Sequence, residues 1–431
     1  MPLVKVLVLL FLFTTSTLAC AEDFLIEHVR VFDGERTIER TSVLVRNRKI
    51  EAIGPHLRAP KGTRAIDGSG RTLLPGLIDA HTHIRARQDL EQSLVVGVTT
   101  DLSMLMDLRL ADEEKAEQRD NKAFDRADLF SSGYCATAPG GHGTEYGLKF
   151  PTLTEPKEAQ AWVDDRIAEG SDYIKIIYEN GGDTGHGGRP SIDKATLQAL
   201  IAGAHTRGKI AIVHIHSEQQ AMDAIESGAD GLAHLFSHGG EQVDPKFAPL
   251  VAAHHAFVIP TFTVLESVCN QSSGQRILDD PKLSSFVLPA YVPQLRKNIN
   301  HGQANHCMFS MTAIPLLSAS HVPILAGTDV GNSGTAPGAS LHGELVYLVE
   351  AGLTPTQALV AATSATATAF KLADRGRIVA GLRADLVLVN GNPTEDIRAT
   401  RDIVAIWKSG VSVDRHAWLR RTIESETGSQ Q

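Results

Sequence analysis

The sequence predicts an α/β protein: a closed (β/α)8 TIM barrel with a small β-sandwich domain formed from both ends of the chain. Between residues 73 and 371, eight short apolar runs alternate with longer amphipathic stretches, a pattern typical of repeated βα units around a parallel sheet. Short alternating strands that stop at glycine occur instead in residues 22–72 and again in 372–420. Eight such units suffice to close a barrel, so we expect the barrel over 73–371 and one joint domain over the flanks.

The first 21 residues have the pattern of a signal peptide. Lys5 precedes an apolar run over residues 6–13, and residues 19–21 offer an A-x-A cleavage site. The run is too short to span a bilayer. We therefore expect an exported protein, periplasmic or secreted, whose mature chain begins near Glu22; lipid anchoring at Cys20 is the alternative. At the other end, residues 421–431 are expected to form a disordered tail.

Composition narrows the class of partner. The net charge of −9 offers no basic surface for nucleic acid or anionic membranes, so a small molecule is the expected partner. Three cysteines remain after the signal peptide, and this odd number excludes a complete set of disulfides. Pairing of Cys269 with Cys307, glycosylation at Asn270 and homo-oligomer formation stay open.

The predicted barrel elements follow one another along the chain. Helices are expected within residues 153–170, 191–208 and 217–228, and the long connection over 265–321 is expected to hold extra helices. The predicted strands are residues 73–84, 95–102, 130–138, 172–179, 209–216, 231–236, 256–264 and 322–329.

His81 and His83 stand one residue apart at the end of the first run. A strand alternates faces, so both point to the same side, together with Asp79. The flanking leucines and isoleucines indicate a buried strand, where two imidazoles need a partner such as a metal ion. A surface strand with an accidental histidine pair is the alternative.

Lys175 lies in the fourth run on the same face as Tyr173 and Ile177, which is expected to point into the barrel. Burial can lower a lysine pKa from about 10.4 by roughly 3–5 units. A neutral amine can add CO2 and become a carbamate, which is an anionic metal ligand. An ion pair with a buried carboxylate, Asp79 or Asp329, explains Lys175 equally well, and both interpretations remain open here.

Further ligand-type residues end the later strands. His214 and His216 both face inward in the fifth run, and His234 follows His214 by 20 residues, the length of one βα unit. Adjacent strands therefore present two histidines at the same level. Asp329 ends the eighth run, which lies beside the first strand in a closed barrel.

In this order, the segment DAHTHI, Lys175, His214, His234 and the segment GTD resemble the amidohydrolase superfamily over nearly the whole chain after the signal peptide. The resemblance implies two divalent metal ions, usually zinc, and hydrolysis by a metal-bridging hydroxide with Asp329 as proton shuttle. It implies a first ion on His81, His83 and Asp329, a second on His214 and His234, and a carboxylated Lys175 that bridges both.

The segments GGHG and IKIIYENGG, with the histidine interval, are similar to the branch that holds prolidase-type dipeptidases and N-acyl-amino-acid hydrolases. The resemblance implies cleavage of the amide (C–N) bond of a dipeptide or N-acyl amino acid. Residues in the mouth of the barrel could then hold the substrate carboxylate or the developing oxyanion. The candidates are His142, which is also a candidate catalytic residue, with Tyr178, His186, Arg189 and His216.

Three other functions remain open. Deaminases and cyclic-amidine hydrolases of the same superfamily typically carry a glutamate three residues after the fifth-strand histidine, where this chain has Ser217. A lactonase or phosphotriester hydrolase would share the metal ligands. A non-catalytic binding relative would be marked by lost ligands, and none is lost.

Overall fold

The computed structural model describes residues 22–179, 188–236, 242–269, 273–299 and 309–428. The predicted signal peptide with Cys20, and also His186, Asn270 and Cys307, lie outside these ranges. Cys269 is disulfide-bonded, and Cys135 is a buried free thiol. Within the described ranges, no helix combines the length and the hydropathy needed to cross a membrane.

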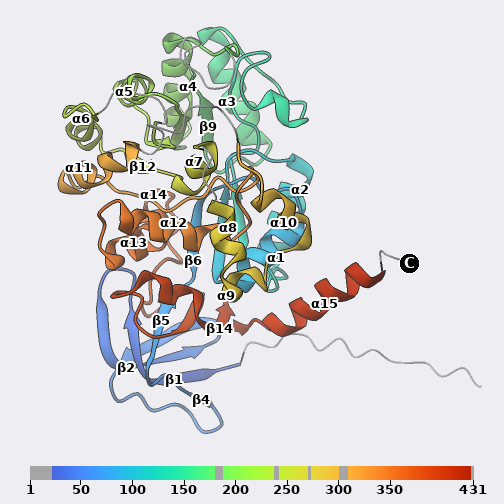
Figure 1. Cartoon of the computed structure of the whole chain (residues 1–431), viewed down its shortest axis with the longest axis vertical. Helices are drawn as coiled ribbons and strands as arrows, with labels where there is room; N and C mark the ends of the chain where they lie inside the picture. The colour runs from blue at the N-terminus through green and yellow to red at the C-terminus, as the bar shows by residue number, and fades with distance from the viewer. Residues whose placement is uncertain (1–21, 180–187, 237–241, 270–272, 300–308, 429–431) are drawn as a thin grey trace, which may run out of the picture.

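Both ends of the chain contribute strands to one mixed sheet at the base of the molecule (Figure 1). β1 is antiparallel to β2 and parallel to β4 and β5, and β5 pairs with β13 from the C-terminal part. Phe24 of β1 stacks on Trp407 of β14 with ring centroids 4.9 Å apart, so the sheet curls over its own core. The two layers of the expected sandwich are thus one continuous sheet, made of β1 (Phe24–Phe32), β2 (Thr37–Arg46), β3 (Lys49–Gly54), β4 (Arg64–Asp67), β5 (Arg71–Pro75), β13 (Leu386–Asn390), β14 (Ile403–Lys408) and β15 (Val411–Ser412).

The first predicted strand, residues 73–84, forms two strands in two different sheets. β5 ends at Pro75 in the curled sheet, and β6 (Leu77–Thr82) begins the barrel. Gly76 joins them, and a Cβ atom at this position would lie only 2.2 Å from Thr99 Oγ1. Glycine alone allows so close a passage, so the chain changes sheet at this residue.

A ring of parallel strands forms the barrel, as predicted. Ala136 N donates to Lys175 O at 2.8 Å and so joins the group β6–β7–β8 to the group β9–β10–β11–β12. The eighth run closes the ring, because Leu325 N bonds to β12 at 2.9 Å and Asp329 N bonds to β6 at 2.8 Å. Besides β6, the strands are β7 (Val98–Ser103), β8 (Asp128–Ser131), β9 (Ile174–Ile177), β10 (Ala211–His214), β11 (Gly231–Ala233) and β12 (Phe257–Ile259).

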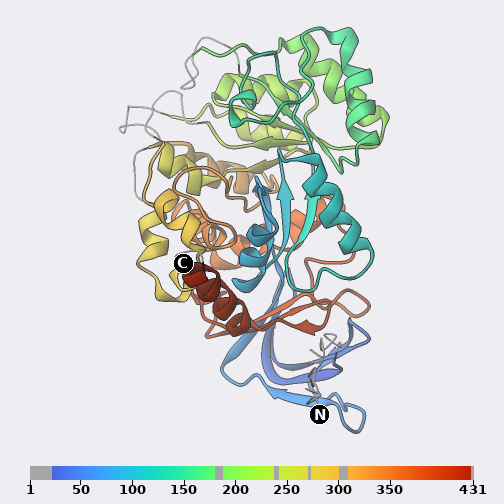
Figure 2. The same cartoon turned by 90° about the vertical axis from the view of Figure 1, so that its right-hand side faces the viewer.

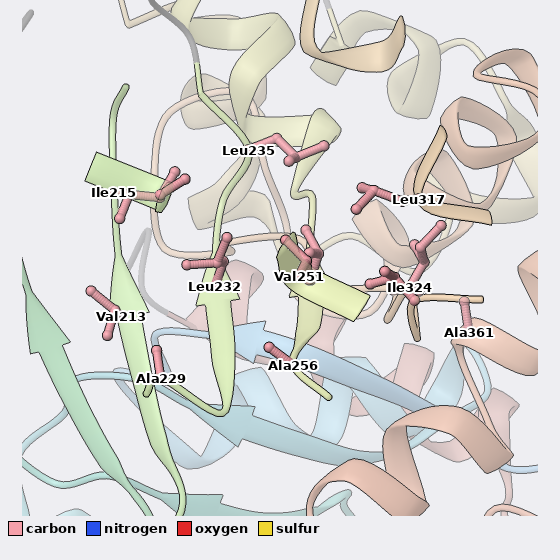
Figure 3. Close-up of a cluster of buried hydrophobic side chains, with 14 of the residues drawn as sticks. Val213, Ile215, Ala229, Leu232, Leu235, Val251, Ala256, Leu317, Ile324 and Ala361 are labelled. Carbon is pink, nitrogen blue, oxygen red and sulfur yellow. The ribbon is translucent and has the colours of Figure 1, made fainter. Parts of the chain in front are cut away.

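Helices cover the outside of the barrel. Val213 and Leu232 on β10 and β11 belong to the same buried cluster as Val251 and Leu317 from the helical layer (Figure 3). The predicted helices are present, and Figures 1 and 2 place α3 and α4 at the end of the molecule far from the curled sheet. The helices are α1 (Arg87–Val95), α2 (Leu108–Arg119), α3 (Ala159–Ala168), α4 (Lys194–Thr206), α5 (Glu218–Glu226), α6 (Phe247–Ala253), α7 (Phe262–Val268), α8 (Ser273–Leu278), α9 (Pro281–Ser284), α10 (Val292–Leu295), α11 (Ala313–Ala319), α12 (Ala339–Glu350), α13 (Pro355–Ala361) and α14 (Ser364–Ala369).

The C-terminal tail differs from the expected disorder. α15 (Arg415–Gly428) continues through most of the residues after 420. Arg415 donates to two backbone carbonyls of the body at 2.7 and 2.9 Å, and Trp418, 3 % exposed, packs with Phe286. These tertiary contacts at the start of the helix outweigh the polar composition of its end.

Candidate active site

A cavity of about 480 Å³ opens at the carboxyl ends of the barrel strands. Barrel enzymes place their chemistry at this end. Of the predicted site residues that the structure describes, Tyr178 is the exception that does not line this cavity. Those that do are His81, His83, His142, Lys175, Arg189, His214, His216, His234 and Asp329.

His81, His83 and Asp329 meet on one side of the cavity. Asp329 Oδ1 lies 3.2 Å from His81 Nε2 and 2.9 Å from His83 Nε2, and the His234 ring lies beside His81 with centroids 4.7 Å apart. Burial raises the pKa of the Asp329 carboxyl, but the facing histidines outweigh burial and hold this pKa well below its ordinary value. An ionised carboxylate among imidazoles is a donor set for a divalent cation. His81, His234 and Asp329 each offer a ligand atom within 4.8 Å of the others.

His234 and Asp329 adopt a left-handed backbone, with φ of 72° and 57°. This region is sparsely populated by residues other than glycine. The neighbouring strands hold both residues there, because His234 N donates to Ile259 O at 2.9 Å and Asp329 N donates to His81 O at 2.8 Å. Strain of this kind persists at functional sites, and here it accompanies two side chains that line one cavity.

Lys175 is 3 % exposed, and its Nζ has no hydrogen-bond partner within the described part of the chain. Burial lowers its pKa to about 7, against the opposing attraction of Asp329. Asp79, the other carboxylate considered as its partner, instead accepts hydrogen bonds from Thr328 Oγ1 at 2.7 Å and His81 N at 3.1 Å. Burying an amine without a hydrogen-bond partner costs free energy, and a ligand in the cavity that bonds to the amine would reduce this cost.

A second cluster surrounds Glu179, which follows β9. Glu179 Oε1 lies 2.6 Å from His142 Nδ1, 2.7 Å from His214 Nε2 and 3.5 Å from His216 Nε2. Burial raises the pKa of Glu179, but the contacts with His142 and His214 outweigh burial and hold it far below its ordinary value. These four buried residues form a second group with ligand atoms within 4.8 Å, so the chain holds two clusters able to bind metal ions.

Glu179 is absent from the residues predicted from the sequence, although a signal for it existed. The alternation that turns Lys175 inward also turns Glu179 inward, and it turns Tyr178 the other way. The Tyr178 hydroxyl accordingly donates to Asp223 Oδ2 at 3.2 Å, and its ring packs in the hydrophobic core. The structure therefore does not bring Tyr178 to the cavity as a substrate contact.

Two of the histidines have one ring nitrogen fixed by a neutral acceptor. His83 Nδ1 donates to Leu105 O at 3.2 Å, and His234 Nδ1 donates to Thr261 Oγ1 at 2.7 Å. Both rings therefore keep Nε2 as a ligand atom. Because the His83 Nε2 lone pair and the Asp329 carboxylate are both acceptors 2.9 Å apart, a cation bound by both fits this arrangement.

The rim of the cavity carries donors for an anion. Arg189 Nε lies 3.6 Å from Glu145 Oε1, and the Tyr146 hydroxyl lies 3.3 Å from His142 Nε2. Arg85 also lines the cavity, and a hydrogen bond to Gly331 O is the polar contact of its guanidinium among the described residues. His186, the remaining predicted rim residue, lies outside the described residues.

Known proteins resemble this chain over most of its length. The amidohydrolase family matches residues 72–413. Ochratoxinase of Aspergillus niger is 22 % identical over 88 % of this chain and 83 % of its own, and imidazolonepropionase of Deinococcus radiodurans is 25 % identical over 84 % and 88 %. The crystal structure of a Xaa-Pro dipeptidase with bound methionine in the active site has the same fold, with a TM-score of 0.72 at 23 % identity over 91 % of this chain and 100 % of that one. The chain belongs to the amidohydrolase family and is a hydrolase with two clusters of residues able to bind metal ions.

Proposed function

We propose that this enzyme hydrolyses an amide bond whose amine side is an amino acid with a free carboxylate, in a dipeptide or an N-acyl amino acid. One arrangement carries the proposal: residues of two clusters able to bind metal ions line one cavity together with Lys175, whose Nζ has no partner among the described residues, and the rim of this cavity offers His142, Arg189 and Arg85. A substrate that presents its carbonyl to the clusters can present its carboxylate to this rim. The methionine in the active site of the Xaa-Pro dipeptidase supports an amino acid as the product. Export of the mature chain, predicted from residues 1–21, is part of the proposal.

Two divalent ions, most consistent with zinc because of the imidazole and carboxylate donors, belong to this proposal. When bound, such ions polarise a carbonyl and acidify water. At a pKa of about 7, part of the Lys175 amine is neutral and able to take up CO2 as a carbamate. The proposed ligands are His81, His83 and Asp329 for one ion and His214 and His234 for the other, with carboxylated Lys175 shared by both.

Asp329 is proposed to move the proton. Its carboxylate is ionised, and Asn332 Nδ2 donates to Oδ2 at 2.9 Å while Oδ1 faces His81 and His83. From this position the carboxylate takes a proton from the attacking water and returns it to the leaving nitrogen. Proton transfer by a placed side chain contributes roughly 10²–10⁴ in rate.

Glu179 is proposed to position two histidines at once. It accepts from His142 Nδ1 at 2.6 Å, which leaves His142 Nε2 beside the Tyr146 hydroxyl, and it contacts His214 Nε2 at 2.7 Å, which leaves His214 Nδ1 as the ligand atom. A neutral His142 that donates from Nδ1 keeps only a lone pair at Nε2, so the Tyr146 hydroxyl beside it is the proposed donor to the substrate carbonyl oxygen as this oxygen gains charge.

A hydrolase of ring amides is the second candidate, because imidazolonepropionase is 25 % identical over 84 % of this chain. Both candidates use the same clusters, but ring opening releases no separate amino acid. The substrate assay therefore needs cyclic amides beside linear ones.

The substrate class is tested by assaying metal-loaded enzyme on dipeptides and N-acyl amino acids, on the same compounds with an amidated carboxylate, and on cyclic amides. A charge-assisted hydrogen bond to the carboxylate contributes about 1.5–3 kcal/mol, so we expect amidation to lower kcat/KM by roughly 10–150-fold. Substitution of the rim residue that binds the carboxylate should narrow this difference, and Arg85→Ala, Arg189→Ala and His142→Ala each test one candidate. Equal rates on free and amidated compounds would reject carboxylate recognition, and activity confined to cyclic amides would favour the second candidate.

Asp329→Asn tests the proton transfer separately from metal binding. The variant keeps an oxygen ligand but loses the base, so turnover should fall at least about 10²-fold while the metal content of the same sample falls only in part. Asp223→Asn, outside the cavity, is the control and should keep turnover. Near-normal turnover of Asp329→Asn would remove Asp329 from the proton transfer.

A further inference from the structure

A second cavity of about 170 Å³ adjoins the active-site cavity on the side of His83. The two cavities share part of their walls, including His83, Arg85, Leu105 and Tyr146. Asn332, which donates to Asp329, also lines both. The side chamber, as we call the second cavity, therefore borders the place where the scissile bond is expected.

The walls that belong to the side chamber alone are largely apolar. They are Ile84 and Met106, each 2 % exposed, with the half-buried Leu148 and with Asp107. Asp107 is the carboxylate among the described lining residues, and it is engaged as the N-cap of α2 by Arg109 N at 2.9 Å and Leu110 N at 3.1 Å. The chamber thus suits an uncharged apolar group.

Arg85 stands where the side chamber joins the main cavity. Its guanidinium donates to Gly331 O, and no carboxylate pairs with it among the described residues. Arg189, by contrast, lines the main cavity alone and already faces Glu145 at 3.6 Å. A carboxylate bound by Arg85 would therefore lie at the entrance of an apolar chamber.

We infer that the side chamber binds the side chain of the leaving amino acid, and that the enzyme prefers a bulky apolar amino acid with its carboxylate on Arg85. This inference rests on the proposed amide hydrolysis and adds the class of amino acid released. An apolar cavity of roughly 150 Å³ is large enough for a benzene ring, so phenylalanine and leucine fit the chamber and glycine leaves it empty.

The test compares N-acetyl-L-phenylalanine, N-acetyl-L-leucine and N-acetylglycine on the metal-loaded enzyme. We expect kcat/KM for the phenylalanine compound to exceed that for the glycine compound by roughly 10–100-fold, because each buried methylene contributes to binding. Leu148→Trp fills the chamber from the mouth loop and should reduce this ratio below about threefold. Leu316→Trp places the same side chain on an exposed position of α11 and should leave the ratio unchanged.

Equal rates on the glycine and phenylalanine compounds, or a preference that Leu148→Trp leaves intact, would overturn the inference. A series of N-acyl-glycines with increasingly bulky acyl groups tests the other side of the bond. If Leu148→Trp alters selectivity in that series instead, the chamber holds the acyl group and the assignment to the leaving amino acid is rejected.

Calorimetric binding of free L-phenylalanine and glycine separates the chamber from the proposed reaction. We expect phenylalanine to bind at least about tenfold more tightly than glycine, with the difference lost in Leu148→Trp. If this holds while no N-acetyl amino acid is hydrolysed, the proposed substrates fail and the chamber stands. Equal binding of the two amino acids rejects the chamber whatever the hydrolysis assay shows.

Discussion

Two buried lysines of this protein meet opposite surroundings. Lys408 on β14 is 1 % exposed and pairs with Asp128 at the start of β8, where Arg375 Nη1 and Arg383 Nη2 reach the same carboxylate at 2.6 and 2.5 Å. Lys175 lines the active-site cavity and has no such partner among the described residues. Burial lowers both pKa values, to about 8 for Lys408 and about 7 for Lys175.

The difference separates a structural use of buried charge from a functional one. At the foot of the barrel, burial raises the pKa of Asp128, but Lys408, Arg383 and Arg375 outweigh it and hold this pKa well below its ordinary value. The charges there are compensated in place, and they join the barrel to the curled sheet. In the active-site cavity, by contrast, the charge of Lys175 is left for a bound ligand to compensate. Substitutions around Asp128 should therefore lower the free energy of unfolding, and substitutions in the active-site cavity should lower activity.

The largest expected effect is on turnover, in Lys175→Ala. Loss of the proposed shared ligand should lower kcat/KM at least about 10²-fold and reduce the bound metal from about two ions per chain towards one. Added short-chain carboxylic acids should restore part of the activity by replacing the proposed carbamate. In metal-free protein the free energy of unfolding should not fall, because the variant removes a buried amine that has no hydrogen-bond partner in the described part of the chain.

Lys408→Ala is the matched control for Lys175→Ala. It removes a buried lysine of the foot, so it should lower the free energy of unfolding while the folded enzyme keeps its metal content and its turnover. A loss of turnover in Lys408→Ala as large as that in Lys175→Ala would contradict the assignment of a structural role to Lys408 and a functional role to Lys175. A wild-type enzyme that is fully active with one tightly bound ion would remove the shared-ligand role of Lys175.

The next effect is on stability, in Asp128→Asn. The variant leaves the buried Lys408 and Arg375 and the partly exposed Arg383 without the carboxylate that joins them, and breaking a buried ion pair costs about 3–5 kcal/mol. Denaturant unfolding measures the loss, and metal analysis of the folded protein should show no change. Asp120→Asn removes a carboxylate that pairs with Lys122 at the surface, 60 % and 67 % exposed, and should leave the free energy of unfolding almost unchanged. A small loss in Asp128→Asn would mean that Asp374 and Asp385 compensate the cations.

The barrel was predictable because its strands are short apolar runs separated by helices, and a parallel sheet buries both faces of such runs. The change of sheet at Gly76 was not predictable, since residues 73–84 read as one apolar run and only the contact with Thr99 shows the crossing. The course of the curled sheet likewise depends on contacts between distant segments, such as Phe24 on Trp407. The order of α15 depends on the packing of Trp418, and the polar residues around Trp418 in the sequence do not indicate this packing.

At the site, alternation and strand ends brought the predicted histidines, Lys175 and Asp329 to one cavity. Their roles as ligands stay a prediction. The same alternation could have found Glu179, which shares the face of Lys175, and it places Tyr178 on the opposite face. The alternation of strand residues could not predict the role of Arg85, because its position between two cavities depends on loops that follow several strands.

The smallest effect, and the one that sharpens the comparison most, is expected for Glu179→Gln. Glu179 lies at the mouth, yet it is compensated in place like Asp128, since His142 Nδ1 and His214 Nε2 lie 2.6 and 2.7 Å from one oxygen. Glutamine keeps the shape and one acceptor, so the free energy of unfolding should change little. Its amide oxygen can still accept from both rings but carries no full charge, so both hydrogen bonds weaken. Outer partners of this kind typically contribute about 10–100-fold to metal affinity or activity. We therefore expect metal affinity, measured by competition with a chelator, to fall about 10–100-fold, and turnover to fall with it.

Glu344→Gln is the control for Glu179→Gln, because this buried carboxylate accepts from Phe262 N and Thr263 N outside the cavity, and its loss should affect stability alone. Reduced turnover with unchanged metal affinity would confine Glu179 to positioning His142, and a variant unchanged in both would reject the positioning role.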